Sequence, residues 1–203
     1  MGETHEHLRW PPPQLHRSGS VLIVYREAWL PFAGGSTLRE EFIMEAELEP
    51  RDPESGDLLK ICASLNAAGA SYIVIGGMAM VAHGFNRGTE DIDLLVDRAV
   101  ENIKKLRQAL SILSDNAVRE VRDSDIEEYG VVRVADEVVV DLMGAACGID
   151  FQAAKDRVVW KEFDGVRIPF ATPELLLETK QTVREKDAID RLYLERILSQ
   201  SGS

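Results

Sequence analysis

Two aspartates, Asp91 and Asp93, stand two residues apart in a segment of alternating polar and apolar residues. In a β-strand, residues two apart point to the same face. Both carboxylates would therefore project side by side, while Ile92, Leu94 and Val96 face the core. Two ionised carboxylates at one spot repel each other unless a cation lies between them. Oxygen ligands of this kind suit Mg²⁺, which completes its coordination shell with water and phosphate oxygens.

A third acid, Asp141, stands alone in the apolar run of residues 138–142. A charge inside such a strand is costly unless it meets a metal, a partner or the strand end. Three acids on two strands can hold one or two Mg²⁺ ions, and two-metal sites align an attacking and a leaving oxygen for in-line phosphoryl displacement. We therefore predict that Asp91, Asp93 and Asp141 are metal ligands and catalytic residues.

A glycine pair fits the same chemistry. Gly76 and Gly77 follow residues 72–75, a short apolar, β-branched run that predicts a buried strand. A strand that ends in two glycines and opens a helix lets backbone N–H groups approach a phosphate closely. The pair precedes Asp91 by fourteen residues, so we expect the two strands to be neighbours in one sheet.

Cations near the C-terminus suit a phosphate-binding role. Lys180, Arg184, Asp187 and Arg191 fall at i, i+4, i+7 and i+11, so they share one polar face if the helix is continuous. The other side of that helix is expected to carry Leu175, Leu176, Val183, Ile189 and Leu192. This polar face is either a solvated surface of Arg–Asp pairs or a phosphate clamp made of Lys180 and Arg184. Beside a triphosphate site we favour the clamp.

The elements that would position these residues follow from periodicity and turn residues. Helices are expected over residues 57–69, 78–83 and 99–113, and two more over 173–199 that begin at the Thr172 cap with Pro173. Strands are expected over residues 72–75 and 91–96, with hairpins at 131–134/138–143 and 158–163/166–170.

Composition limits the function classes. The chain has 203 residues, 45% of them hydrophobic, and a net charge of −12. A chain this acidic does not coat nucleic acid with a basic surface, so any RNA contact needs a local basic patch or a metal. Cys62 and Cys147 form neither a disulfide framework nor a zinc pattern, which favours a reducing cytoplasm. The chain shows no apolar run of about 18 residues, so we expect no membrane span.

The first fifty residues differ from the rest. They include a Pro11–Pro13 tract, a Ser18–Ser20 patch typical of linkers and most of the histidines. Such composition cannot bury a core. We therefore expect residues 1–50 to form a flexible N-terminal appendage and residues 51–203 to form the functional domain.

Together these motifs resemble the polymerase-β-type nucleotidyltransferase superfamily, whose pattern is an apolar strand, a glycine pair, Asp-x-Asp and a later single acid. The chain is more closely similar to the bacterial AbiEii-like and MenT-type nucleotidyltransferase toxins. The residues that carry this closer resemblance are His83-Gly84, Arg87-x-Thr89-x-Asp91-x-Asp93 and the C-terminal Lys180, Arg184, Lys186-Asp187 and Asp190. The resemblance covers roughly residues 57–198.

The resemblance implies an α/β (α+β) nucleotidyltransferase fold, with a mixed β-sheet flanked by helices and further helices at the C-terminus. It implies Mg²⁺-dependent transfer of a nucleoside monophosphate from a nucleoside triphosphate to an acceptor hydroxyl, releasing pyrophosphate. Asp141 would also help to activate that hydroxyl. The residues implied to act on the nucleotide are Lys180 in catalysis, and Gly76, Gly77, Arg87, Thr89 and Arg184 in binding. From charge alone, Arg87 either contacts phosphate or pairs with Glu90.

Several acceptors remain open. RNA is favoured, above all the 3′ end of tRNA, in a toxin that a cognate antitoxin protein neutralises. The alternatives are an enzyme that modifies an antibiotic or a protein, and a non-catalytic module of the same fold that binds a nucleotide or a partner. Small antitoxin-type relatives usually show Gly-Ser and Ser-Asp-x-Asp, whereas this chain has Gly-Gly and Thr89-Glu90-Asp91, which favours the toxin or antibiotic-modifying branches. The sequence does not name the nucleotide base or the oligomeric state.

Overall fold

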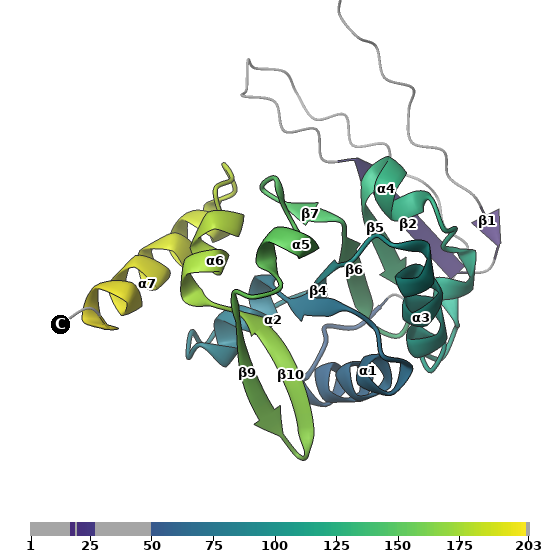
Figure 1. Cartoon of the computed structure of the whole chain (residues 1–203), viewed down its shortest axis with the longest axis horizontal. Coiled ribbons are helices and arrows are strands. Elements are labelled where there is room, and N and C mark those ends of the chain that lie inside the picture. The colour runs from purple at the N-terminus through teal and green to yellow at the C-terminus, as the bar shows by residue number, and fades with distance from the viewer. Residues whose placement is uncertain (1–16, 19, 27–49, 202–203) are drawn as a thin grey trace, which may run out of the picture.

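A computed structural model of the chain describes residues 17–18, 20–26 and 50–201 (Figure 1). In this part of the chain an eight-stranded sheet has the order β1-β2-β5-β6-β4-β3-β10-β9. Its strands are β1 (Arg17–Ser18), β2 (Ser20–Arg26), β3 (Tyr72–Val74), β4 (Asp91–Val96), β5 (Gly130–Ala135), β6 (Val139–Met143), β9 (Val158–Phe163) and β10 (Val166–Ala171). A small ribbon of β7 (Ala145–Ala146) and β8 (Ile149–Asp150) accompanies it.

Helices flank this sheet. They are α1 (Ser55–Ala68), α2 (Gly76–Ala82), α3 (Val100–Leu110), α4 (Asp125–Tyr129), α5 (Phe151–Ala154), α6 (Pro173–Thr179) and α7 (Glu185–Ser201), with a 3-10 turn at Ala117–Glu120. The sheet is mixed, because β4 pairs with β6 and β3 with β10 in parallel, while the other pairs are antiparallel. The predicted fold class, a mixed sheet flanked by helices, is therefore confirmed.

Both predicted hairpins are present. Strands β5 and β6 pair antiparallel, as do β9 and β10. Asp164 and Gly165, at the tip of the second hairpin, have φ values of 49° and 78°. Positive φ at both central residues matches the right-handed twist of the strands, which is why this dipeptide is a strong hairpin signal. The predicted neighbours β3 and β4 also pair directly.

The core lies between the sheet and helices α1 and α3. Helix α1 begins with a capping box between Glu54 and Asp57. It ends before Gly69, which has the left-handed conformation, close to the predicted end of this helix. In β4, Ile92 and Leu94 are fully buried. Because side chains alternate along a strand, this burial leaves the aspartates of β4 on the opposite face.

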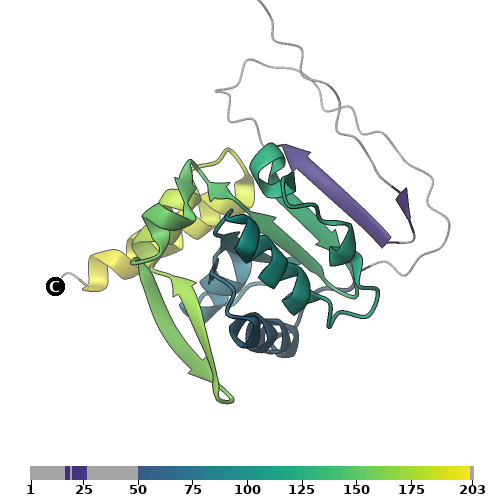
Figure 2. The same cartoon turned by 45° about the vertical axis from the view of Figure 1, so that its right-hand side comes forward.

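Strand β2 comes from the segment that the sequence assigns to an appendage. It pairs with β5 from Leu22 opposite Val134 to Arg26 opposite Gly130, and Figure 2 shows it running alongside that strand. Residues 1–16, with the proline tract, and residues 19 and 27–49 lie outside the described residues. The boundary at residue 50 stays a prediction.

The C-terminal helices correct one expectation. Two helices follow Thr172, whose hydroxyl accepts from Leu175 N–H with Pro173 in the first turn, as predicted. They are not continuous, because α6 ends at Thr179 and α7 begins at Glu185. Arg191 Nη1 donates to Lys180 O at 2.5 Å and to Thr182 O at 3.1 Å. These bonds satisfy two carbonyl groups of the segment between the helices, and the Thr182 hydroxyl, which accepts from Arg184 N–H, offers the backbone there an alternative to a helix.

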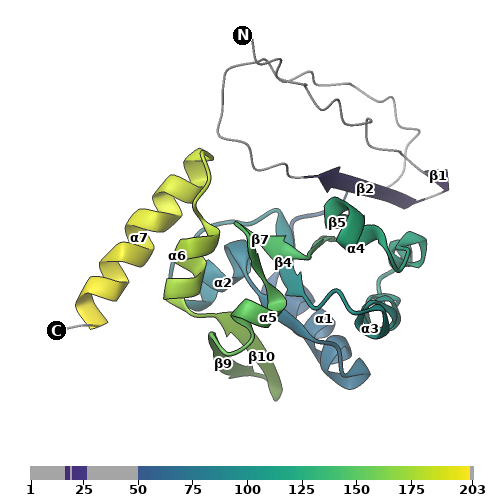
Figure 3. The same ribbon diagram turned by 45° about the horizontal axis from the view of Figure 1, so that its top comes forward.

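The break also changes which side of α7 is buried. Val183, Ile189 and Leu192 are 97%, 54% and 69% exposed, so the expected apolar face along both helices is wrong for them. Asp187, Asp190 and Leu194 face inward instead. In Figure 3, α6 and α7 lie on the opposite side of the molecule from α3.

Among the described residues, no helix combines the length and apolar character that a membrane span needs.

Candidate active site

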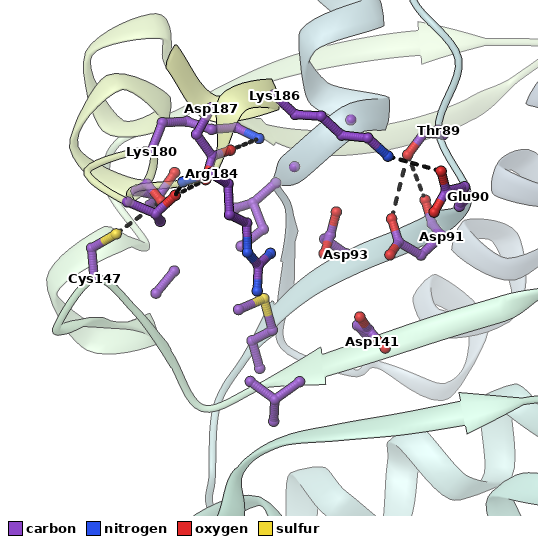
Figure 4. Close-up of a pocket in the computed structure, with 18 of the residues that line it drawn as sticks. Thr89, Glu90, Asp91, Asp93, Asp141, Cys147, Lys180, Arg184, Lys186 and Asp187 are labelled. Atoms are coloured by element: carbon purple, nitrogen blue, oxygen red, sulfur yellow. Dashed lines mark hydrogen bonds and ion pairs between the residues drawn. The ribbon is translucent and has the colours of Figure 1, made fainter. Parts of the chain in front are cut away.

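Three carboxylates meet on the face of the sheet opposite its buried apolar residues. Parallel pairing of β4 with β6 sets Asp93 opposite Asp141, and Asp91 lies two residues earlier on β4. One oxygen from each of these aspartates lies within 4.8 Å of the others. Figure 4 shows the three side chains around one space. The predicted meeting of these acids from two strands is present, and such a small set of carboxylates fits Mg²⁺, which keeps water or phosphate in its other positions.

The carboxylates lie in a cavity of about 670 Å³. Its walls come from β4, β5 and β6, the start of α2 and the turn between α6 and α7. All predicted site residues line it: Gly76, Gly77, Arg87, Thr89, Asp91, Asp93, Asp141, Lys180 and Arg184. In Figure 4 the Arg184 side chain extends from the α6–α7 turn into this space. The volume is in the range of small-molecule sites.

The glycine pair packs directly against the acids. Gly76 has a φ of 61°, and a Cβ added there would lie 1.7 Å from Asp93 Oδ2. A Cβ at Gly77 would lie 2.3 Å from Thr89 Oγ1. The backbone of Gly77 also hydrogen-bonds the Asp93 carboxylate. Glycine is needed at position 76 because a side chain would displace the Asp93 carboxylate, and at position 77 because it would displace Thr89. The contact of the two glycines with phosphate stays a prediction.

Arg133 is a site residue that the sequence analysis missed. From β5, its Nε donates to Asp141 Oδ1 at 2.8 Å and its Nη2 to Asp141 Oδ2 at 2.6 Å. The same Nη2 lies 3.1 Å from Asp91 Oδ2. Asp141 therefore has the partner that a charged residue in an apolar strand requires. The available signal was a lone arginine in a valine-rich strand, opposite a lone aspartate in the predicted hairpin.

A second ion cluster joins α7 to the cavity. Asp190 is fully buried, and its carboxylate lies 3.1 Å from Arg87 Nε and 2.8 Å from Lys180 Nζ. Lys180 Nζ also lies 3.1 Å from Asp187 Oδ1. Two cations and two anions balance one another, as buried charges must. Arg87 therefore does not take Glu90 as its partner, because Lys186 pairs with Glu90 instead.

Burial and like charge raise the proton affinity of Asp93 and Asp91. Burial first, and then the negative charges of Asp91 and Asp141, raise the pKa of Asp93 to about 7. Burial and Asp141 also raise the pKa of Asp91. Asp91 and Asp93 therefore resist ionisation, and a cation beside them would oppose this effect.

Comparison with known protein families identifies the family of the chain. The sequence model of the family described as "Nucleotidyl transferase AbiEii toxin, Type IV TA system" matches residues 57–180, more than half of the chain. The chain belongs to the AbiEii nucleotidyltransferase toxin family. It is therefore a nucleotidyltransferase by family, and the match includes the glycine pair, all three carboxylates and Lys180.

Solved structures of nucleotidyltransferases are also similar to this AbiEii family member. A Thermotoga maritima protein described as a nucleotidyltransferase is 18% identical, covers 71% of this chain and 86% of its own, and gives a TM-score of 0.42. An antigenic nucleotidyltransferase-like protein from Paracoccidioides brasiliensis is 17% identical over 73% of this chain and 78% of its own, with a TM-score of 0.46. No curated protein matches the chain.

The two cysteines and His83 occupy three different places in the structure. Cys62 is buried in the core. Cys147 lines the cavity with a φ of 49°, and its thiol lies 2.9 Å from Thr179 O. His83 caps α2, and its Nε2 lies 2.8 Å from Ala171 O.

The raised pKa of Asp93 predicts a pH effect on the stability of the metal-free AbiEii-family chain. Between about pH 4 and pH 7 the folded protein keeps a proton that the unfolded chain, with an ordinary value of 3.8, has lost. The free energy of unfolding therefore falls as pH rises through this window. The side chain of Asp93→Asn cannot ionise. The free energy of unfolding of this variant, relative to that of wild type, should therefore increase by about 1–3 kcal/mol between pH 5 and pH 8.

Urea unfolding in EDTA at several pH values measures this difference. A stability difference between Asp93→Asn and wild type that does not change with pH would contradict the assigned environment of Asp93.

Proposed function

We propose that the protein is a Mg²⁺-dependent enzyme that transfers a nucleoside monophosphate from a nucleoside triphosphate to an acceptor hydroxyl. The observation that supports it most is the group of three carboxylates within 4.8 Å in a cavity. Asp91, Asp93 and Asp141 would hold Mg²⁺. When bound, the ion would supply positive charge beside the reacting phosphate.

The residues around the acids suit the rest of the reaction. The acceptor oxygen bonds to the α-phosphorus, the bond from that phosphorus to the bridging oxygen breaks, and pyrophosphate leaves with the electron pair. Lys180 and Arg184, which line the cavity, would bind the triphosphate, whose charge needs cations close by. Asp141, opposite Asp93 on the paired strand β6, would orient the acceptor hydroxyl and accept its proton as the new bond forms.

For the acceptor we propose RNA, with the 3′ end of tRNA favoured, in a cytoplasmic toxin that a cognate antitoxin counters. The family description, a toxin of a toxin–antitoxin system, supports the biological part of this proposal. A protein or an antibiotic is the second candidate acceptor, because the net charge of −12 disfavours a long polyanion.

One labelling experiment tests the reaction and the acceptor together. The protein is incubated with Mg²⁺, each of the four α-labelled triphosphates, total RNA, cell protein and an aminoglycoside. We expect label in RNA and release of pyrophosphate. Label in protein or in the aminoglycoside would replace RNA as the acceptor. Absence of label in every pool would favour a non-catalytic binding module.

RNA binding is expected to depend only weakly on salt. Near the cavity, the cations that a short RNA end can reach are few, among them Arg184 and Lys186. Each neutralised phosphate contributes about 0.7–0.9 to the slope of log affinity against log salt. A titration between low and moderate salt should therefore show a slope of roughly two to four phosphate contacts. A much steeper slope would require an extended basic surface.

Lys180→Ala should reduce transfer more than it reduces RNA binding. Lys180 lies among Asp187 and Asp190 at the cavity, where it would meet the triphosphate and not the acceptor. We expect transfer to fall by about 100-fold, while the dissociation constant for RNA changes little. Lys180→Arg keeps the charge and controls for loss of the buried ion cluster, and thermal unfolding reports its stability. Equal loss of transfer and of RNA affinity would contradict this role.

A further inference from the structure

Arg133 occupies the carboxylate oxygens that a metal would use. Strands β5, β6 and β4 are neighbours, and Arg133, Asp141 and Asp93 stand opposite one another across them. The guanidinium contacts both oxygens of Asp141, at 2.8 and 2.6 Å, and reaches Asp91 Oδ2 at 3.1 Å. It therefore bridges two of the three acids, one from each of the two strands that form the cluster.

This contact is stronger than a surface ion pair. Arginine keeps its charge at any pH that the protein meets, and its planar fork matches a carboxylate with two parallel hydrogen bonds. The Arg133 side chain is 30% exposed and that of Asp141 only 9%. Such partial shielding from water strengthens the attraction between the two charges. A divalent ion that enters the cluster must compete with this bidentate pair.

We propose that Arg133 is an internal cation that competes with the divalent metal for Asp141 and Asp91, and so weakens binding of the free ion. This inference rests on the proposed function of the three carboxylates. When the guanidinium is on the acids, Asp141 and Asp91 have a cationic partner without a metal. A free divalent ion must displace the Arg133 guanidinium without help, whereas an ion that arrives with a triphosphate brings additional oxygen ligands from the phosphates. Arg133 thereby favours joint binding of metal and nucleotide.

The test is calorimetric titration of the metal-free full chain with Mn²⁺ alone, at fixed pH and ionic strength. We expect Arg133→Met to bind Mn²⁺ roughly tenfold more tightly than wild type, a change equivalent to about 1.4 kcal/mol. Arg133→Lys keeps the charge but cannot form the fork, so its affinity should lie between the two. Lys186→Met is the matched control. It removes one positive charge from the same cavity, but Lys186 pairs with Glu90 and not with the cluster.

The outcomes separate this inference from the proposed function. Equal or weaker Mn²⁺ binding by Arg133→Met would overturn the inference and leave the metal site standing, because Arg133 would then support Asp141 as a ligand. An equal gain in Lys186→Met would also overturn it, since removal of any nearby charge would suffice. If neither wild type nor any variant binds Mn²⁺, the metal site fails and the inference with it. If circular dichroism shows that Arg133→Met is unfolded, Arg133→Lys against wild type decides.

Discussion

Asparagine in place of Asp91, Asp93 or Asp141 is expected to abolish nucleotidyl transfer. Each substitution keeps the size of the side chain and removes one of three charges that meet within 4.8 Å. Loss of one ligand charge weakens binding of the metal ion that the reaction needs, so we expect initial rates to fall by about 1,000-fold or more. Incorporation of α-labelled nucleotide, measured at saturating Mg²⁺, gives the rate for each variant.

The control for this prediction is Asp164→Asn. It makes the same chemical change in the β9–β10 turn, where residue 164 has a φ of 49° that asparagine also adopts readily. It should transfer nucleotide at the wild-type rate. Circular dichroism of the three site variants should show an unchanged fold. Full activity in any one of them would remove the role assigned to that aspartate.

The geometry of the carboxylates could be predicted because it depends on local rules. Alternation along a strand places Asp91 and Asp93 on one face whatever the rest of the chain does. The position of Asp141 beside them needs one further step, namely that its strand pairs with β4. The parallel pairing of β4 with β6 provides that step, which periodicity alone does not specify.

The cation partners could not be predicted because they depend on tertiary packing. Arg133 reaches Asp91 across β6, a contact between strands that are not neighbours. Asp190 meets Arg87 from a helix about a hundred residues later in the chain. The polar face shared by Lys180, Arg184 and Arg191 required a continuous helix, but the chain turns after Thr179 and Arg191 binds the backbone of that turn. Spacing along the chain describes a helix face only while the helix continues.

Gly76→Ala is the other substitution that we expect to reduce nucleotidyl transfer strongly. Gly76→Ala would place a methyl group 1.7 Å from Asp93 Oδ2, in a backbone conformation with a φ of 61°. Since the glycine cannot move away without disturbing α2, Asp93 must leave its position among the acids. Misplacement of a reacting group by about 1 Å can cost about 100-fold in rate, so we expect at least that loss of transfer. The left-handed backbone should also cost about 1–3 kcal/mol of stability.

Gly88→Ala is the matched control, because a Cβ at Gly88 would meet no atom within 4 Å and its backbone is not left-handed. Both variants add one methyl group, and Gly88 lies in the sequence between Arg87 and Thr89, which line the cavity. Initial rates of transfer and urea unfolding of both, beside wild type, separate a local steric effect from a general effect of alanine. We expect Gly88→Ala to behave as wild type while Gly76→Ala loses both rate and stability. If Gly76→Ala transfers nucleotide within a few-fold of wild type, Asp93 does not need the position that the glycine protects.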